Sequence, residues 1–216
     1  MTILAIDTSL DACSFALLRR GGGTAPVVVS EPMATGHAEI FFSLLHRLFA
    51  AAGVGPGDVG RIAVTVGPGS FTGIRVGLAA ARGLGLAWKV AVRGATTLDV
   101  FAYAQLASGR PFAVLIDARR GAFYRQLYNV PGDISGPALV PAAAPLAGLG
   151  ADVALAGPGA RRVEPEGREI LAAPEHLPIA DLALMAAADH AMRPPAPLYL
   201  RDADARPQAH AALARL

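Results

Sequence analysis

The chain has 216 residues, 53% hydrophobic and 17% charged, which supplies enough apolar material for a packed core and excludes the composition of a disordered chain. The formal net charge is only +2 and no long run of Lys or Arg occurs, which argues against a large nucleic-acid-binding surface of its own. A single cysteine, Cys13, excludes an internal disulfide and fits a reducing compartment.

The chain begins directly with an apolar strand pattern, without the basic start of a signal peptide. Its longest apolar stretch, Phe71–Trp88, is interrupted by Arg75 and Arg82 and carries four glycines, so it makes a poor membrane span. We therefore expect a soluble cytoplasmic protein that does not cross a membrane.

Apolar runs separated by turn signals predict a mixed α/β order in the first half of the chain. Residues 3–6 and 13–18 are two short apolar runs, and the polar Asp7-Thr8-Ser9 segment after the first of them predicts the turn of a β-hairpin. The further predicted elements are a strand at 27–30, a helix at His37–Ala52, a strand at 61–66, a helix at Phe71–Trp88, a strand at 90–92 and a helix at 97–107.

The second half repeats this order in outline. The hairpin whose first strand ends in Asp7 recurs at residues 113–128, where the first strand ends in Asp117. A strand that runs into Gly-Pro-Gly also occurs twice, at residues 64–69 and 153–159. Two echoes in one order favour an internally duplicated α/β protein with two related lobes, although strand-to-turn patterns of this kind also recur by coincidence.

The division that follows has a first lobe at residues 1–105, completed by the C-terminal segment 190–216. A second, smaller lobe covers residues 106–189. The later elements are a Pro-, Ala- and Gly-rich, weakly periodic stretch at 131–178, a helix at 179–192, a short strand or extended segment at 198–201 and a frayed helix or disordered end at 210–216.

Residues 67–73, Gly-Pro-Gly-Ser-Phe-Thr-Gly, form a glycine-rich turn between a strand and a helix. Backbone N–H groups at such a turn can bind an anion, so Gly67 and Gly69 are candidate phosphate contacts. A P-loop needs a Gly-Lys-Ser/Thr sequence that is absent here, and the third glycine of a dinucleotide fingerprint comes one residue late at Gly73. The default interpretation is a tight structural turn.

Asp7 and Asp117 each close the first strand of a predicted hairpin. Two carboxylates at strand ends can hold a magnesium ion between the lobes, or each can cap its own turn. We assign no metal ligand beyond this candidate pair and no cofactor to the chain. The five histidines form no His-x-x-x-His pair, Cys13 lies in an apolar strand, and Ser70 is in the wrong frame for a nucleophile elbow.

Two helices have unusually wide apolar surfaces. In Phe71–Trp88 a stripe of small residues recurs every fourth position, which permits close approach of another backbone, and in His37–Ala52 phenylalanines widen the apolar face. Burial within the chain and pairing with a partner explain this pattern equally well. The candidate partner-interface residues are Phe41, Phe42, Leu45, Phe49, Phe71, Gly73, Ile74, Gly77, Ala81 and Gly85.

A second stripe of the same helix is polar, with Arg75, Arg82 and Lys89 seven residues apart. We expect these side chains to face solvent. The same expectation holds for the short arginine pairs, which read as solvated turns; they are Arg19-Arg20, Arg119-Arg120 and Arg161-Arg162.

Four motifs together resemble those of the bacterial TsaB (YeaZ) family, in that family's order and over nearly the whole chain. They are Ile-Leu-Ala-Ile-Asp-Thr-Ser at 3–9, Gly-Pro-Gly-Ser-Phe-Thr-Gly-Ile-Arg-Val-Gly at 67–77, Asp-Ala-Arg-Arg-Gly at 117–121 and Pro-Leu-Tyr-Leu-Arg at 197–201. The second motif is highly specific, whereas the first alone would be weak. The resemblance implies an actin/hexokinase/Hsp70-like (ASKHA) fold of two lobes.

The resemblance also implies a function. It points to the complex that transfers threonylcarbamoyl from threonylcarbamoyl-AMP to N6 of the adenosine next to the tRNA anticodon. In that system the paralogue TsaD is catalytic, the ATPase TsaE joins the complex, and TsaB pairs with TsaD through first-lobe helices. The implied role is a scaffold or activating subunit that is no enzyme on its own, forms a homodimer without TsaD, and meets tRNA, ATP and a divalent metal only through its partners.

Two enzymatic alternatives stay open, a metallopeptidase of the O-sialoglycoprotein endopeptidase type and a small-molecule kinase of the same fold. The catalytic paralogue carries a metal-binding His-x-x-x-His after its glycine-rich helix, whereas residues 96–103 here contain no histidine. The Asp7-Thr8-Ser9 segment also lacks the glycine that admits an ATP phosphate in active kinases of this fold. Both absences favour a partner subunit that has lost catalysis.

Overall fold

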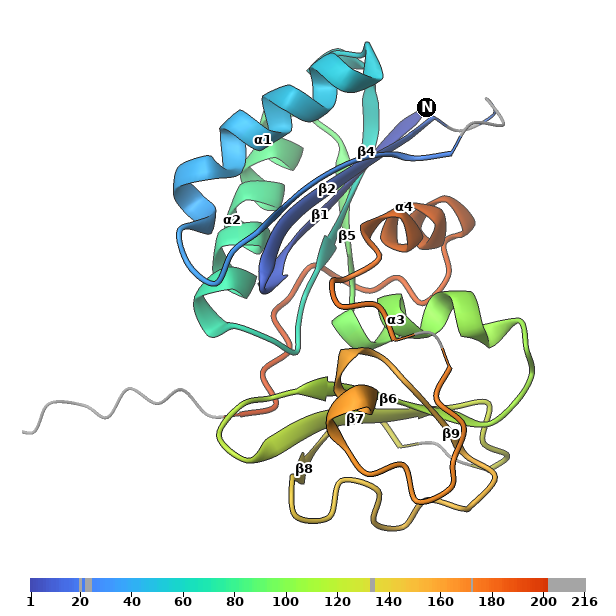
Figure 1. Cartoon of the computed structure of the whole chain (residues 1–216). Helices are drawn as coiled ribbons and strands as arrows, with labels where there is room; N and C mark the ends of the chain where they lie inside the picture. Colours follow the sequence, from blue (N-terminus) through green and yellow to red (C-terminus); the bar gives the residue numbers. More distant parts are fainter. Residues whose placement is uncertain (20, 22–24, 133–134, 172, 202–216) are drawn as a thin grey trace, which may run out of the picture.

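The computed structural model describes residues 1–19, 21, 25–132, 135–171 and 173–201. The chain forms two β-sheets with helices between them and on one outer face (Figure 1). None of the described helices combines the length and apolar character needed to span a membrane. The element expected at 210–216 lies outside the described residues.

The first sheet has five strands in the order β3-β2-β1-β4-β5. The hairpin β1–β2 and the outer strand β3 are antiparallel, and β4 and β5 run parallel to β1. The strands are β1 Thr2–Leu10, β2 Ala12–Arg19, β3 Val27–Pro32, β4 Val59–Thr65 and β5 Ala91–Ala95. Helices α1 (His37–Ala52) and α2 (Phe71–Trp88) make the crossovers and cover one face of this sheet (Figure 1).

The second sheet has four strands in the order β8-β7-β6-β9. Strands β6 and β7 form an antiparallel hairpin, β8 extends it, and β9 pairs parallel with β6. The same arrangement of hairpin, antiparallel outer strand and parallel neighbour occurs at β3-β2-β1-β4. The strands are β6 Phe112–Asp117, β7 Ala122–Tyr128, β8 Ala138–Pro141 and β9 Ala154–Ala156, with short 3-10 turns at Pro56–Asp58 and Pro158–Arg162.

Helices α3 (Thr97–Leu106) and α4 (Ile179–Ala188) lie between the two sheets. Because side chains alternate along a strand, Leu4 of β1 faces α1 and α2 while Ile3 faces α3 and α4. Phe112 of β6 joins the core of α3 and α4 from the other side. One continuous apolar cluster therefore connects the two halves, and α4 packs on β1, β2 and α3.

The polar segment Asp7-Thr8-Ser9 is not the hairpin turn that the sequence predicts. Strand β1 continues through it to Leu10, with an irregular register between Asp7 and Leu10, and the turn falls at Asp11. All three polar residues are buried and hydrogen-bonded to neighbouring parts of the chain, which lets a strand carry them. The strand β8 and both 3-10 turns were not predicted.

The two Gly-Pro-Gly echoes are not at equivalent levels of the two sheets. In the first half Gly67 comes three residues after Val64, which pairs with Ile6 one residue before Asp7. In the second half Gly157 directly follows Ala156, whose partner lies three residues before Asp117. Along the strand direction, the first Gly-Pro-Gly turn thus begins beyond the level of Asp7, whereas the second begins before the level of Asp117. The strand arrangement repeats in the two sheets, but the position of this turn does not.

Candidate functional site

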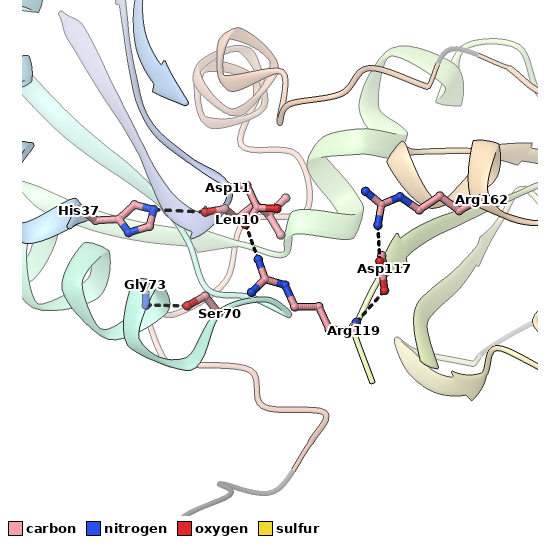
Figure 2. A network of polar contacts seen from close by, with 8 residues as sticks. All are labelled: Leu10, Asp11, His37, Ser70, Gly73, Asp117, Arg119 and Arg162. Atoms are coloured by element: carbon pink, nitrogen blue, oxygen red, sulfur yellow. Dashed lines mark hydrogen bonds and ion pairs between the residues drawn. The ribbon is translucent and has the colours of Figure 1, made fainter. Parts of the chain in front are cut away.

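The two hairpin turns meet across a cleft between the sheets (Figure 2). The Arg119 guanidinium donates to the Asp11 carboxylate at 2.6 Å, joining the turn of the second hairpin to that of the first. The cleft is lined by residues of both halves, among them Asp7, Leu10, Asp11, Asp117, Arg119, Arg162, Glu175 and His176. The carboxylates of Asp7, Asp11 and Asp117 therefore line one cleft.

Asp7 forms the buried side of this cleft and is fully inaccessible to solvent. Its Oδ1 accepts hydrogen bonds from the Ser9 backbone N–H at 3.0 Å, the Ser9 hydroxyl at 2.5 Å and the Thr65 hydroxyl at 2.5 Å. Its Oδ2 has no partner among the described residues. Burial raises the pKa of Asp7, and the hydrogen bonds to Ser9 and Thr65 oppose that rise only in part.

Asp117 lies at the same cleft in a different environment. It accepts from the Arg119 backbone N–H at 2.7 Å, which caps the hairpin turn, and its other oxygen pairs with the Arg162 guanidinium. The structure therefore brings Asp7 and Asp117 to one pocket, but an arginine already neutralises Asp117. Among the described residues no group of three His, Cys, Asp or Glu side chains is placed to hold a metal ion.

The turn at residues 67–73 packs against the chain's own strand β1. The Ser70 backbone N–H donates to the Ser9 carbonyl at 2.7 Å, and the Ser70 hydroxyl caps α2 by accepting from the Gly73 N–H at 3.2 Å. A Cβ atom at Gly69 would lie 2.2 Å from the Ser9 carbonyl oxygen. Gly69 is thus needed for the close packing of the start of α2 on β1, and the role of Gly67 and Gly69 as phosphate contacts stays a prediction.

Most of the predicted interface residues on the two helices are covered by the chain itself. The buried ones are Phe41, Leu45, Gly73, Ile74, Gly77, Ala81 and Gly85. The stripe of small residues faces the first sheet, since a Cβ at Gly77 would meet the Thr8 hydroxyl at 2.6 Å and one at Gly85 the Val92 side chain at 2.3 Å. The assignment of this stripe to a partner was wrong; it brings α2 close to β1 and β5.

Three of the predicted residues remain accessible. Phe42 on α1 is 64% exposed, and Phe49 and Phe71 are half-buried. Phe49 contacts Trp88 of α2 edge-on, with ring centroids 6.0 Å apart.

The sequence interpretation missed a second, exposed stripe of α2. Leu86 is 83% exposed, and a Cβ at Gly83 would have nothing within 4 Å. Ala79, Gly83 and Ala87 are four residues apart and exposed, so small residues surround the protruding leucine on the outer face. The same four-residue spacing that drew attention to the inner stripe was present here as a signal.

Arg75, Arg82 and Lys89 are exposed, as expected, and two of them also contact the C-terminal part of the described chain. The Arg75 guanidinium lies over the Phe71 ring at 3.7 Å and donates to the Tyr199 hydroxyl at 3.1 Å. Arg82 donates to the Pro195 carbonyl at 2.5 Å. The polar stripe of α2 thereby holds the C-terminal segment of the described chain.

The predicted arginine pairs are likewise more than solvated turns. Arg19 donates to the carbonyls of Ala52 and Gly53 at the end of α1, at 2.8 and 3.2 Å. At the cleft, Arg119 pairs with Asp11 and Arg162 pairs with Asp117. Each of these arginines fixes a loop or a helix end.

Comparison with known proteins agrees with this architecture. Residues 14–156 match the family model described as TsaD, tRNA N6-adenosine threonylcarbamoyltransferase. Proteins named tRNA threonylcarbamoyladenosine biosynthesis protein TsaB are 36% identical over 133 residues in Bacillus subtilis and 34% identical over 131 residues in Escherichia coli, covering 60% of this chain in each case. These matches cover 56% and 55% of the relatives, so the chain aligns with just over half the length of its named relatives.

Longer matches exist to proteins without an assigned function and to solved structures. An uncharacterized Mycobacterium tuberculosis protein is 34% identical over 215 residues, which is 96% of this chain and 95% of the relative. The crystal structure described as YeaZ from Pseudomonas aeruginosa is 29% identical and superposes with a TM-score of 0.72 over 92% of this chain and 99% of its own. Another Pseudomonas aeruginosa structure, described as similar to peptidase YEAZ, gives a TM-score of 0.76 at 29% identity over 93% of this chain and 99% of its own. On these matches, the chain belongs to the TsaB (YeaZ) family.

Proposed function

We propose that this protein is the non-catalytic scaffold or activating subunit of the complex that makes threonylcarbamoyladenosine in tRNA. It pairs with the catalytic paralogue TsaD, and the ATPase TsaE joins that pair. Membership of the TsaB (YeaZ) family supports the pathway. The chain itself contributes a docking surface, while tRNA, ATP and a divalent metal are handled through the partner subunits.

The observation that carries the proposal is the exposed apolar surface on the layer of helices α1 and α2. The side chains of Phe42 and Leu86 are 64% and 83% exposed, whereas large apolar side chains in a protein core are almost fully buried. Gly83 lies on the same outer face of α2 with open space above it. An exposed glycine inside a helix costs about 1 kcal/mol relative to alanine, and close approach of a partner helix offsets that cost.

The site between the hairpins supports a role without chemistry of its own. The first turn of α2 directs the Ser70 N–H to the chain's own Ser9 carbonyl. Arg162 is paired with Asp117, and the Asp7 carboxylate is enclosed by hydroxyl groups of its own sheet. The proposed complex therefore places the threonylcarbamoyl transfer on TsaD, and without TsaD the same surface joins two copies of this chain in the cytoplasm.

The fold proposed for this function is of the ASKHA type, with two lobes from an internal duplication. Support comes from the shared strand arrangement β3-β2-β1-β4 and β8-β7-β6-β9. The first lobe is residues 1–105 with the segment that follows residue 190, and the second is 106–189. Helix α4 falls in the second range by sequence, although it packs on strands β1 and β2 of the first range and on helix α3.

The experiment is a reconstitution with unmodified tRNA, threonylcarbamoyl-AMP, TsaE, ATP and TsaD from the same organism. Modified adenosine is quantified by mass spectrometry, and TsaD affinity by calorimetry. Leu86→Glu and Phe42→Glu are expected to weaken TsaD binding at least about tenfold, because a charge replaces a buried apolar contact. The matched control is Leu139→Glu, which changes a 39% exposed leucine on β8.

Three results would refute the proposal. TsaD that modifies tRNA equally well without this chain removes the requirement for a subunit. Unchanged TsaD affinity in both helix variants, or an equal loss in Leu139→Glu, removes the surface on α1 and α2. Modification by this chain without TsaD would refute the non-catalytic role, because the chain would then carry out the transfer itself.

A further inference from the structure

The last described residues, 193–201, form an extended segment that we call the strap. It begins as an added pairing partner of β5, because the backbone groups of Arg193 and Gly94 exchange two hydrogen bonds of 2.8 and 2.9 Å. It then crosses the Gly-Pro-Gly turn, where the Leu198 N–H donates to the Val66 carbonyl at 2.7 Å. The strap therefore follows the edge of the first sheet to the start of α2.

At α2 the strap is held by aromatic and cationic contacts. The Tyr199 ring lies 4.8 Å from the Phe71 ring, centroid to centroid, and the Tyr199 hydroxyl accepts from Arg75. Arg75 in turn covers the Phe71 ring. Since Phe71 is the first residue of α2, this cluster ties the strap to the helix start.

At its other end the strap reaches the second hairpin. Arg201 donates to the carbonyls of Ala118 and Arg119 at 3.2 and 3.4 Å, which lie in the turn between β6 and β7. The side chain of Arg119 crosses the cleft to Asp11 (Figure 2). A continuous series of contacts thus runs from Asp11 through Arg119, Arg201 and the strap to α2.

We propose that the strap couples the closure of the cleft between the hairpin turns to the packing of the strap residues on α2. Breaking the Asp11–Arg119 pair increases the mobility of the second hairpin turn, and the hydrogen bonds of Arg201 transmit this increase to Tyr199. Coupling through contiguous contacts is reciprocal, so loosening the α2 end also loosens the hairpin turn. The proposal concerns the isolated chain, and it is tested without any partner.

Hydrogen exchange on the isolated protein tests the coupling at single amides. Asp11→Asn is expected to speed exchange of the Leu198 amide, which does not touch Asp11, by about two- to fivefold, the range for loss of one exposed ion pair. In the reverse direction Arg75→Ala is expected to speed exchange of the Ala122 amide, which bonds the Arg119 carbonyl at 3.2 Å. Arg110→Gln is the matched control, because it removes an exposed ion pair, with Glu169, that is no part of the series of contacts from Asp11 to α2.

The decisive comparison repeats Asp11→Asn in an Arg201→Gln background. If the strap carries the coupling, Arg201→Gln abolishes the effect of Asp11→Asn on Leu198. The proposal is overturned if Asp11→Asn leaves the Leu198 rate unchanged, if Arg110→Gln alters it equally, or if the effect persists in full without Arg201. Far-ultraviolet circular dichroism of each variant checks that the fold is retained.

Discussion

Two glycines of α2 give opposite predictions for the same substitution. A Cβ at Gly73 would lie 2.0 Å from the Thr8 carbonyl oxygen, a backbone atom that cannot rotate away. A Cβ at Gly83 would find nothing within 4 Å. Gly→Ala inside a helix is worth about 1 kcal/mol in helix propensity. The two variants therefore share this gain and differ in the packing of α2 on β1.

For Gly73→Ala the clash outweighs the gain in propensity. Helix α2 must move away from β1 by more than 1 Å to reach an ordinary contact distance, and overpacking of this kind costs about 3 kcal/mol. The shift also lengthens the 2.7 Å hydrogen bond from the Thr8 hydroxyl to the Gly73 carbonyl, worth about 1 kcal/mol. The expected net loss is about 3 kcal/mol, whereas Gly83→Ala is expected to gain about 1 kcal/mol.

Both values are measured by urea unfolding followed by circular dichroism, with the slope m compared between variants. In thermal unfolding, about 2–4 °C per kcal/mol is expected for a chain of this size, so the two variants should melt on opposite sides of the wild type. A Gly73→Ala protein as stable as the wild type would refute the close approach of α2 to β1. Gly77→Leu would not test an interface on α2, because Gly77 faces Thr8 of the chain's own strand β1.

Three further outcomes follow from buried polar groups. Burial raises the pKa of Asp7 above its ordinary value of about 3.9, so the stability that Asp7 contributes is present below about pH 4 and is lost as pH rises through the raised pKa. In urea unfolding, the free energy of unfolding of Asp7→Asn should therefore increase relative to that of the wild type from pH 4 to 7. A difference that does not change with pH would contradict this. Burial, with a smaller effect of the Asp7 charge, raises the pKa of Cys13 to about 12. Thiol reagents at pH 8 should therefore label Cys13 at least about a hundredfold more slowly in the native protein than in the unfolded protein. Equal labelling rates would contradict the burial of Cys13. Asp99→Ala removes the carboxylate that accepts from the Tyr128 hydroxyl at 3.0 Å and from Arg193 at 3.2 Å. The variant should lose about 2 kcal/mol of unfolding free energy, less than for a fully buried ion pair, because Arg193 is partly exposed. A loss under about 0.5 kcal/mol in chemical unfolding would contradict the role of this contact.

Much of the element order follows from local sequence. The helices His37–Ala52 and Phe71–Trp88 have the bounds that their apolar period and flanking glycines predict, because a 3.6-residue period and a glycine turn are local signals. The strand Ala122–Tyr128 is likewise found as predicted. By contrast, Asp7 is polar and stands beside a threonine and a serine, so local rules predict a turn where the structure continues a strand.

The direction in which α2 faces was decided by tertiary structure alone. The sequence shows small residues at every fourth position but carries no information on which of two such stripes meets the sheet. Packing on β1 buries the stripe with Gly73 and Gly77 and leaves Gly83 and Leu86 outside. The periodicity alone therefore does not distinguish the stripe that packs on the sheet from the stripe that stays exposed.

The family, the two hairpins and the main helices could be predicted from the sequence, because these depend on motifs and on periodicity within short segments. The contacts between distant segments are visible only in the folded chain. It placed Asp11 against Arg119, Arg75 against Tyr199 and Arg201 against the second hairpin turn. Such pairs join residues far apart in the chain, and no local pattern selects one arginine over another until the two sheets are brought together.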